Sequence, residues 1–563
     1  MRHRVAALMV LGAVLACAGT GAPRTPGGPQ PISAYPPRNL QSRSPLTRAE
    51  RTGFTETSTH ADVVAFVDSL AVLSNEMHVT TFGRSAGGKA LPLVVLSRPA
   101  VRTAAEAKRM NRPIVYVQAN IHGGEVEGKE ALLALLRDLA RDRYQNVLDS
   151  IVLLAVPIYN ADGNDAMAPQ ERNRRSQQGP ALIGERPNGQ GLDLNRDYIK
   201  AEAPETRASL DLFREWDPDV LVDLHTTNGS YHGYALTWAP PLNPAATFTG
   251  PFTRDTILPA LRAVLRRTLR VETFPYGNFM SQDSAARGWF TYDHRPRFGT
   301  NYYGLRGRIA ILSEAYSHDP FERRVASTYG FVMELLSLVA RNADAIVEAG
   351  READRRTIAF AFTMNASPPL AIRSRITQTP RMDDVLVEEI VRTGDSTRHE
   401  AGMPPGVRRT GTMRQTRLPV FDRFDPWLVQ TVPYAWVFPG EHTAIVEALR
   451  RHGVFVERLL ERVTLPVEAF TVDSVARAAR PFQGHQEVRL EGRWASAPLV
   501  LDSGSFVVRG GQPLGVVALY LLDPQSDDGY ATWNQFDPWL SEGARFPVAR
   551  VPGQFTSRLI RVP

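Results

Sequence analysis

Four apolar, strand-like runs of this chain each lead into a polar side chain. The polar residues are His122 after the run at 114–117, Asn160 after 151–157, His225 at the end of 220–225, and Glu314 at the end of 308–314. Stretches of helical apolar spacing lie between the runs, at 125–141, 204–216, 253–269 and 321–346. Strands alternating with helices predict an α/β layer architecture, in which ligands gather outside the strand ends. The polar residues are therefore expected to lie near one edge of a sheet.

The pair His122 and Glu125 has metal-ligand spacing, because an imidazole and a carboxylate lie three residues apart in a strand-to-helix turn. Zinc takes such ligands, and a catalytic site uses three of them while one position stays open for water. His225 is the candidate for the third ligand. A lone histidine at a strand end is more often structural, so this assignment depends on the partial site that already exists. Asp223, on the same face of the strand as His225, is a candidate to orient a ligand ring. We expect one Zn²⁺ ion.

The start of the chain predicts export. Arg2, His3 and Arg4 precede an apolar run from Val5 to Leu15, and Val14-Leu15-Ala16-Cys17 resembles the lipobox of bacterial lipoproteins. We expect a signal peptide at 1–17, a lipid anchor on Cys17 and a flexible Pro/Gly/Ser-rich tether at 18–46. Ordinary signal cleavage a few residues later is the alternative. No later segment has ~18 uncharged apolar residues, so the lipid is the only expected membrane contact.

Charge argues against a nucleic-acid partner. The formal charge is +6, the pI is about 9.4, and 43% of residues are hydrophobic. The basic residues are spread along the chain instead of forming one block, and no nucleic-acid recognition motif accompanies them. A folded enzyme or binding protein acting outside the cytoplasm is the better expectation.

Several motifs in order resemble the zinc carboxypeptidases of the carboxypeptidase A type. They are His122-x-x-Glu125, Asn160-Ala161-Asp162-Gly163, Asp193-Leu194-Asn195-Arg196, the strand-end His225 and Ile311-Leu312-Ser313-Glu314. The resemblance covers about 47–350. It implies an α/β/α sandwich around a mixed, mainly parallel sheet, with zinc held by His122, Glu125 and His225 at the strand ends.

The resemblance also implies roles for other residues. Glu314 would act as general base, and Asn195 with Arg196 would bind the substrate carboxylate. Arg172, the first arginine of Arg172-Asn173-Arg174-Arg175-Ser176, would stabilise the oxyanion; Arg174 and Arg175 are rivals, and a solvated basic turn is the other possibility. Tyr292 would close over the substrate, with Tyr302 and Tyr303 as competitors or as packing residues.

Residues 351–563 are predicted to form an accessory region of one or two β-rich modules. Its strand-like runs include Thr357 to Phe362 and Val516 to Leu522, and the stretch 381–423 is polar and rich in charge. Trp533, Trp539 and Tyr530 could form a carbohydrate platform, although aromatic residues near turns are usually packing anchors.

These features predict a zinc metallocarboxypeptidase that hydrolyses the C-terminal peptide bond of peptides. One alternative is a peptidase that cleaves γ-D-glutamyl-diaminopimelate bonds of the cell wall with the same metal site. The other is a surface binding protein that keeps the fold without turnover. The presence of Glu314 together with all three ligands favours an enzyme.

Overall fold

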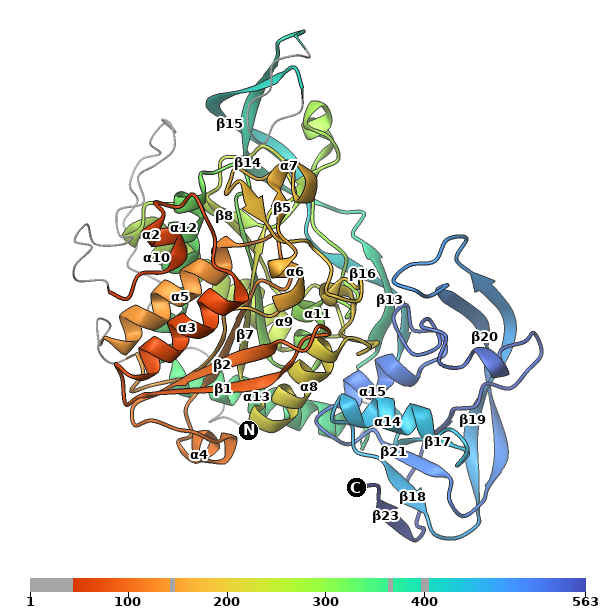
Figure 1. Cartoon of the computed structure of the whole chain (residues 1–563). Helices are drawn as coiled ribbons and strands as arrows, with labels where there is room; N and C mark the ends of the chain where they lie inside the picture. Colours follow the sequence, from red (N-terminus) through yellow and green to blue (C-terminus); the bar gives the residue numbers. More distant parts are fainter. Residues whose placement is uncertain (1–43, 142–146, 363–367, 396–404) are drawn as a thin grey trace, which may run out of the picture.

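A mixed eight-stranded sheet forms the centre of the region at about 47–350, the expected catalytic half of the chain (Figure 1). The computed structural model describes residues 44–141, 147–362, 368–395 and 405–563, so the expected signal peptide, Cys17 and the tether up to residue 43 lie outside the described residues. The strand order is β1-β2-β4-β3-β7-β12-β8-β9. The strands are β1 (Met77–Arg84), β2 (Ala90–Leu96), β3 (Ile114–Ala119), β4 (Val152–Val156), β7 (Val220–Thr226), β8 (Leu236–Ala239), β9 (Thr273–Pro275) and β12 (Ile309–Ala315).

The four central strands β4, β3, β7 and β12 run parallel to one another. The neighbouring strands β2 and β8 pair with β4 and β12 in the antiparallel direction. Every residue of these four strands is buried, which explains why they read as continuous apolar runs in the sequence. The register places Glu314 beside His225, and Asp223 beside Gln118. Asp223, His225 and Glu314 therefore lie on one face of the sheet, near the carboxyl ends of β7 and β12.

Helices cover both faces of this sheet (Figure 1). On one face lie α3 (His60–Ala71), α5 (Glu127–Ala140), α10 (Leu258–Thr268) and α12 (Phe321–Arg341), whose apolar residues share one core with the strands. On the other lie α4 (Ala104–Arg109), α8 (Pro204–Trp216) and α11 (Gly299–Leu305). Thr59 caps α3 by a capping box with Asp62. The predicted α/β/α sandwich is thus confirmed.

Helix α13 (Ala343–Phe360) runs across the expected domain boundary at residue 350. The strand expected at Thr357 to Phe362 is wrong, because residues 357–360 are the last turn of this 18-residue helix. Among the described residues, none of the helices has both the length and the apolar character that crossing a bilayer requires.

The charged stretch at 381–423 folds as a long antiparallel pair, β14 (Arg381–Arg392) and β15 (Val407–Phe421). β15 also pairs with β11 (Trp289–Phe290) of the catalytic half. Glu388 of β14 is buried there. Its carboxylate accepts hydrogen bonds from Arg409 Nε at 2.8 Å and from the Tyr316 hydroxyl at 3.1 Å. The polar sequence of this pair thus reflects a buried ionic anchor together with solvent-facing strand positions.

The C-terminal module, residues 432–563, contains a seven-stranded sheet in the order β20-β19-β22-β17-β21-β18-β23. Its strands are β17 (Ala435–Phe438), β18 (Glu457–Leu459), β19 (Val463–Arg477), β20 (Val488–Leu501), β21 (Phe506–Arg509), β22 (Ala549–Val551) and β23 (Leu559–Arg561). Two helices, α14 (Thr443–Arg451) and α15 (Gly515–Leu522), lie between the sheet and the catalytic half (Figure 1). This sheet agrees with the expected β-rich region.

One expectation for this module is wrong, and one of the alternatives for its aromatic residues is excluded. Val516 to Leu522 forms helix α15 instead of a strand; every residue of α15 is buried, and a short apolar run buried on all sides has no periodicity to reveal its type. Trp533 and Tyr530 are only 1% and 2% exposed, so they pack in the interior and cannot form a carbohydrate platform with Trp539.

The anchor at Glu388 gives the first prediction. Arg409→Met would leave a buried carboxylate without its cation, which costs about 3–5 kcal/mol in comparable sites. We expect a clear drop in the urea midpoint and faster proteolysis of the β14–β15 pair. Arg414→Met on the same strand is the matched control, because the Arg414 side chain is 72% exposed and its pair with Glu389 is solvated. Equal effects of the two substitutions would contradict the anchor.

Candidate metal centre

The loop between β3 and α5 is held in shape by Asn120. Its backbone is left-handed, with φ of 62°, and its side-chain nitrogen donates hydrogen bonds to the carbonyl oxygens of His122, Gly123 and Glu125 at 3.1–3.2 Å. A short polar side chain tolerates this backbone conformation and can bond locally. The loop therefore presents His122 and Glu125 in one fixed arrangement. The only sequence signal for Asn120 was an amide residue directly after a buried strand.

The same loop lies against the segment that begins at Asn160. Asn160 caps a short helix by accepting from the Gly163 amide at 2.8 Å, and it donates to the Ile121 carbonyl oxygen at 3.2 Å. A Cβ atom on Gly123 would lie 2.3 Å from the carbonyl carbon of Gly163. The two backbones thus touch where any larger residue would clash. The Asn-Ala-Asp-Gly motif therefore supports the loop between β3 and α5 that carries His122 and Glu125.

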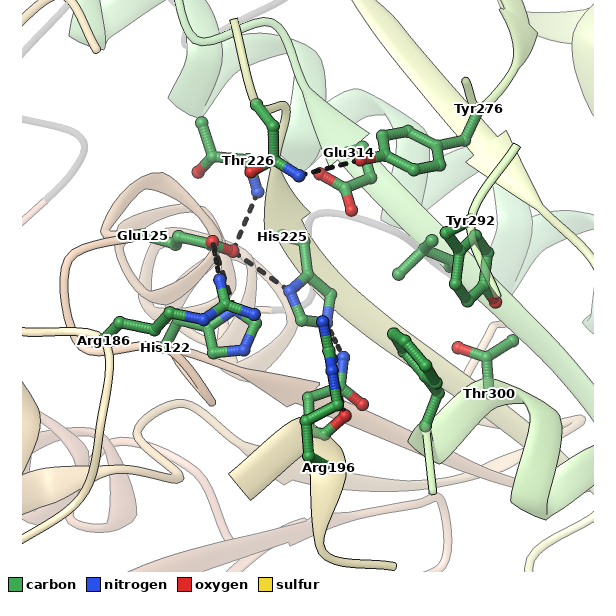
Figure 2. Close-up of a pocket in the computed structure, with 14 residues that line it drawn as sticks. His122, Glu125, Arg186, Arg196, His225, Thr226, Tyr276, Tyr292, Thr300 and Glu314 are labelled. Atoms are coloured by element: carbon green, nitrogen blue, oxygen red, sulfur yellow. Dashed lines mark hydrogen bonds and ion pairs between the residues drawn. The ribbon is translucent and has the colours of Figure 1, made fainter. Parts of the chain in front are cut away.

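His122, Glu125 and His225 come together as a group whose ligand atoms all lie within 4.8 Å of one another. All three are buried, and Figure 2 shows them converging. The Nδ1 atoms of the two rings lie 3.1 and 3.0 Å from separate oxygens of Glu125. Two imidazole nitrogens and one carboxylate are a donor set that zinc accepts, and they leave a fourth position open. The residues present therefore fit a zinc ion.

The far nitrogens of both rings face carboxylates. His122 Nε2 hydrogen-bonds Asp193 Oδ1 at 3.1 Å. Asp223 Oδ2 lies 2.9 Å from His225 Nε2, outside good hydrogen-bond alignment. Carboxylates in this place orient ligand rings and make them better donors. The position of Asp223 agrees with its expected role. Asp193 belongs to one of the motifs named above, but no role was predicted for it.

Glu314 lines the same cavity, and its Oε2 atom is buried without a hydrogen-bond partner in the structure. Burial raises the pKa of Glu314 to about 8, with His225 acting in the opposite direction and Glu125 in the same one. A buried carboxyl group with a free oxygen and a raised pKa is suited to take up and release a proton.

Arg196 lies across this cavity from Glu314 (Figure 2), and Asn195 also lines the cavity. The Arg196 guanidinium stacks over the ring of Phe298 at 3.8 Å, and its Nη1 donates to the Asn195 carbonyl oxygen at 2.7 Å. Asn195 Oδ1 accepts from the Gly299 amide at 2.9 Å. Stacking leaves the edge of the guanidinium able to bind a planar anion such as a carboxylate.

The structure does not bring Arg172 to the site. Its side chain is 74% exposed and lies 3.7 Å from Glu185, away from the cavity. Arg175 is also exposed. Arg174 reaches Glu125 Oε1 at 2.6 Å, but its Nη2 donates to the carbonyl oxygens of Thr226 and Thr227. Of the basic turn, only Arg174 therefore touches a ligand residue.

Arg186 lines the cavity, although no role was predicted for it from the sequence. Its Nε donates to Asp193 Oδ2 at 2.9 Å, and its Nη1 lies 3.6 Å from Glu125 Oε1. No motif surrounds it, and its closeness to the motif at 193–196 was the only available clue. Figure 2 shows the guanidinium directed at the ligand group. Arg186 is therefore better placed than Arg172 to meet a substrate oxygen.

Two tyrosines line the cavity. Tyr292, the tyrosine predicted to close over the substrate, is one of them, and it packs against Phe298 with ring centroids 5.2 Å apart. Tyr276, which the sequence did not single out, packs against Tyr292 at 5.8 Å. Tyr302 and Tyr303 are buried elsewhere: Tyr302 hydrogen-bonds His452 and Tyr303 donates to the Pro218 carbonyl oxygen. The two competitors thus have packing roles.

The chain is similar in sequence to known carboxypeptidases. A family model described as "Zinc carboxypeptidase" matches residues 63–245. "Carboxypeptidase 2" of Trichophyton tonsurans is 24% identical over 493 residues, covering 83% of this chain and 81% of that protein. The protein of the same name from Trichophyton rubrum is 23% identical over 505 residues, with the same coverage. A metallo-carboxypeptidase structure from Burkholderia cenocepacia is 17% identical and covers 51% of this chain and 70% of that one, with a TM-score of 0.37.

The family match includes the positions of His122, Glu125, Asn195, Arg196 and His225, whereas Glu314 lies beyond its end. The matches to the Trichophyton proteins extend well past the catalytic half. Residues 63–245 thus match a zinc carboxypeptidase domain, and these similarities support a metallocarboxypeptidase-type hydrolase.

Proposed function

We propose that this protein is a zinc-dependent exopeptidase that removes the C-terminal residue of a peptide. One observation carries the proposal: a single cavity is lined by the three candidate ligands, by Glu314 with its unpartnered oxygen, and by Arg196. A structural metal site needs neither a free carboxylate oxygen nor a stacked guanidinium beside it. Hydrolysis next to a free carboxylate needs both.

His122, Glu125 and His225 would hold the zinc ion, with Asp193 and Asp223 behind the two rings. When bound there, zinc supplies Lewis-acid chemistry, which lowers the pKa of water and polarises a carbonyl group. Arg196 and Asn195 bind the terminal carboxylate, so the last peptide bond lies within reach of Glu314. A guanidinium suits this task because its planar fork pairs with both carboxylate oxygens.

Glu314 accepts a proton from the attacking water through Oε2 as the oxygen bonds to the peptide carbon. It then gives the proton to the leaving nitrogen as the C–N bond breaks, so that a free amine and a new carboxylate result. The raised pKa of Glu314 supports this role, because the group holds the proton between the two steps. Arg186 donates N–H groups to the carbonyl oxygen as negative charge develops on it.

Mixed peptides test the proposal. We expect the zinc-loaded full chain to release single C-terminal residues from free-acid peptides, as seen by mass spectrometry, and a chelator to abolish this release. Internal fragments would contradict it. Cleavage confined to γ-D-glutamyl-diaminopimelate peptides would place the substrate in the cell wall. Zinc binding without any turnover would instead indicate a binding protein.

Glu314→Gln removes the proton acceptor but keeps the side-chain volume. We expect kcat to fall by about 10²–10⁴, the usual contribution of general acid–base catalysis. The zinc content, measured by plasma mass spectrometry, should not change, because Glu314 is not one of the proposed ligands. Unchanged hydrolysis in a zinc-loaded Glu314→Gln sample would exclude this mechanism.

The two arginine assignments separate in a matched pair of variants. Arg186→Ala should lower kcat by about 10²–10³, the effect of losing one oxyanion donor. Arg172→Ala should leave kcat unchanged, because the Arg172 side chain is 74% exposed and lies outside the cavity. Both are measured with the same peptide and equal zinc loading. The opposite ranking would restore Arg172 as the oxyanion residue.

A further inference from the structure

The segment that carries Asn195 and Arg196 is held from the side of the C-terminal module. The backbone amide of Asp193 donates to the side-chain oxygen of Gln483 at 2.8 Å. Gln483 and Gly484 have φ of 50° and 79°, and mutual hydrogen bonds between Phe482 and His485 close a tight turn around them. Two successive left-handed residues are typical of a two-residue hairpin turn. The turn presents Gln483 rigidly to the active-site segment.

A second contact fixes the backbone of Arg196 itself. Lys200 Nζ donates to the Arg196 carbonyl oxygen at 2.7 Å, and the Lys200 side chain is only 2% exposed. The ammonium group lies 4.5 Å from the ring centroid of Trp533 in the C-terminal module. A cation over a buried indole is attracted electrostatically. Further along the segment, His485 pairs with Glu202 at 2.8 Å.

A third contact holds the aromatic support beneath the Arg196 guanidinium. Arg297 donates from its backbone amide and its Nε to the two oxygens of Asp528, at 2.6 and 2.9 Å. Asp528 is fully buried, and Trp533 Nε1 also donates to it at 2.9 Å. The residue after Arg297 is Phe298, on which Arg196 stacks. Asp528 of the module thus anchors the backbone directly before Phe298.

We propose that the C-terminal module is part of the substrate site, with Gln483 and Asp528 as positioning residues for Asn195 and Arg196. The inference rests on the proposed exopeptidase function. An arginine on a mobile segment loses conformational entropy when it binds a carboxylate, and a preorganised one loses less. The three contacts act on both sides of Arg196. Gln483 holds the backbone at Asp193, three residues before it, and Lys200 holds its own carbonyl oxygen. Asp528 holds Arg297, the residue before the Phe298 ring beneath its guanidinium.

The test uses one peptide that the wild type trims, in free-acid and C-terminally amidated forms. The ratio of kcat/KM for acid over amide measures recognition of the terminal carboxylate. Gln483→Met should lower this ratio about five- to tenfold, the range expected for one lost hydrogen bond, mainly through a higher KM for the acid. If Gln483 had a purely structural role, the substitution would lower kcat/KM equally for both substrates and leave the ratio unchanged.

Gln486→Met is the matched control, because Gln486 lies near the same turn, is exposed and bonds only within the module, to the Ala478 carbonyl oxygen. It should keep the wild-type ratio. Asp528→Asn is the second test and should lower the ratio further; if it fails to fold, the Gln483 and Gln486 variants decide. Zinc content and the thermal midpoint are measured for each.

The outcomes distinguish the two proposals. If the wild type cleaves the free-acid and amidated forms equally well, it does not recognise the terminal carboxylate and the proposed function fails. If the wild type prefers the free acid while Gln483→Met keeps the full preference, the function stands and the positioning role of the module is refuted.

Discussion

The site depends on one buried carboxylate, Glu125. Its Oε1 receives His122 Nδ1 and Arg174, and its Oε2 receives His225 Nδ1 and the Thr226 amide. These partners come from the loop after β3, the end of β7 and the basic turn at 172–176, three segments that share no local hydrogen-bond pattern. Burial alone would favour the neutral acid, but Arg174 and His122 outweigh it and hold the pKa of Glu125 well below its usual range. The charge of Glu125 thus organises the metal centre.

The sequence predicted the parts of the site that local pattern controls. His122, His225 and Glu314 follow or end buried strands, so their common edge could be foreseen from parallel-strand geometry. Arg186 could not, because it lies on a loop whose path is set by contacts with Asp193 and Glu125. Helix α15 was mistaken for a strand because its residues are buried on all sides. Tertiary contacts and burial on all sides, which no local pattern reveals, limited the prediction.

The two halves of the chain are physically one unit. One apolar core includes Tyr116 of the central sheet and Trp436 and Tyr520 of the C-terminal module. Buried polar pairs cross the same junction, among them Arg297 with Asp528 and Tyr302 with His452. Buried charges that lose their partners are expensive. Separating the halves would therefore expose apolar surface and leave ions unpaired, which agrees with relatives whose similarity extends over both halves.

The pairing of β7 with β12 has a consequence for the accuracy of folding. Glu314 and His225 are register partners, and Ile309, Ile311 and Leu224 point to the opposite face, into the core under α5 and α12. Sliding β12 by one residue would turn Glu314 away from the cavity and also turn these apolar side chains away from their core. A misaligned sheet would therefore lose its hydrophobic packing, so it is unstable for a reason that does not involve the catalytic residues. The packing of the core thus selects the strand register that the site requires, although the core side chains take no part in the chemistry.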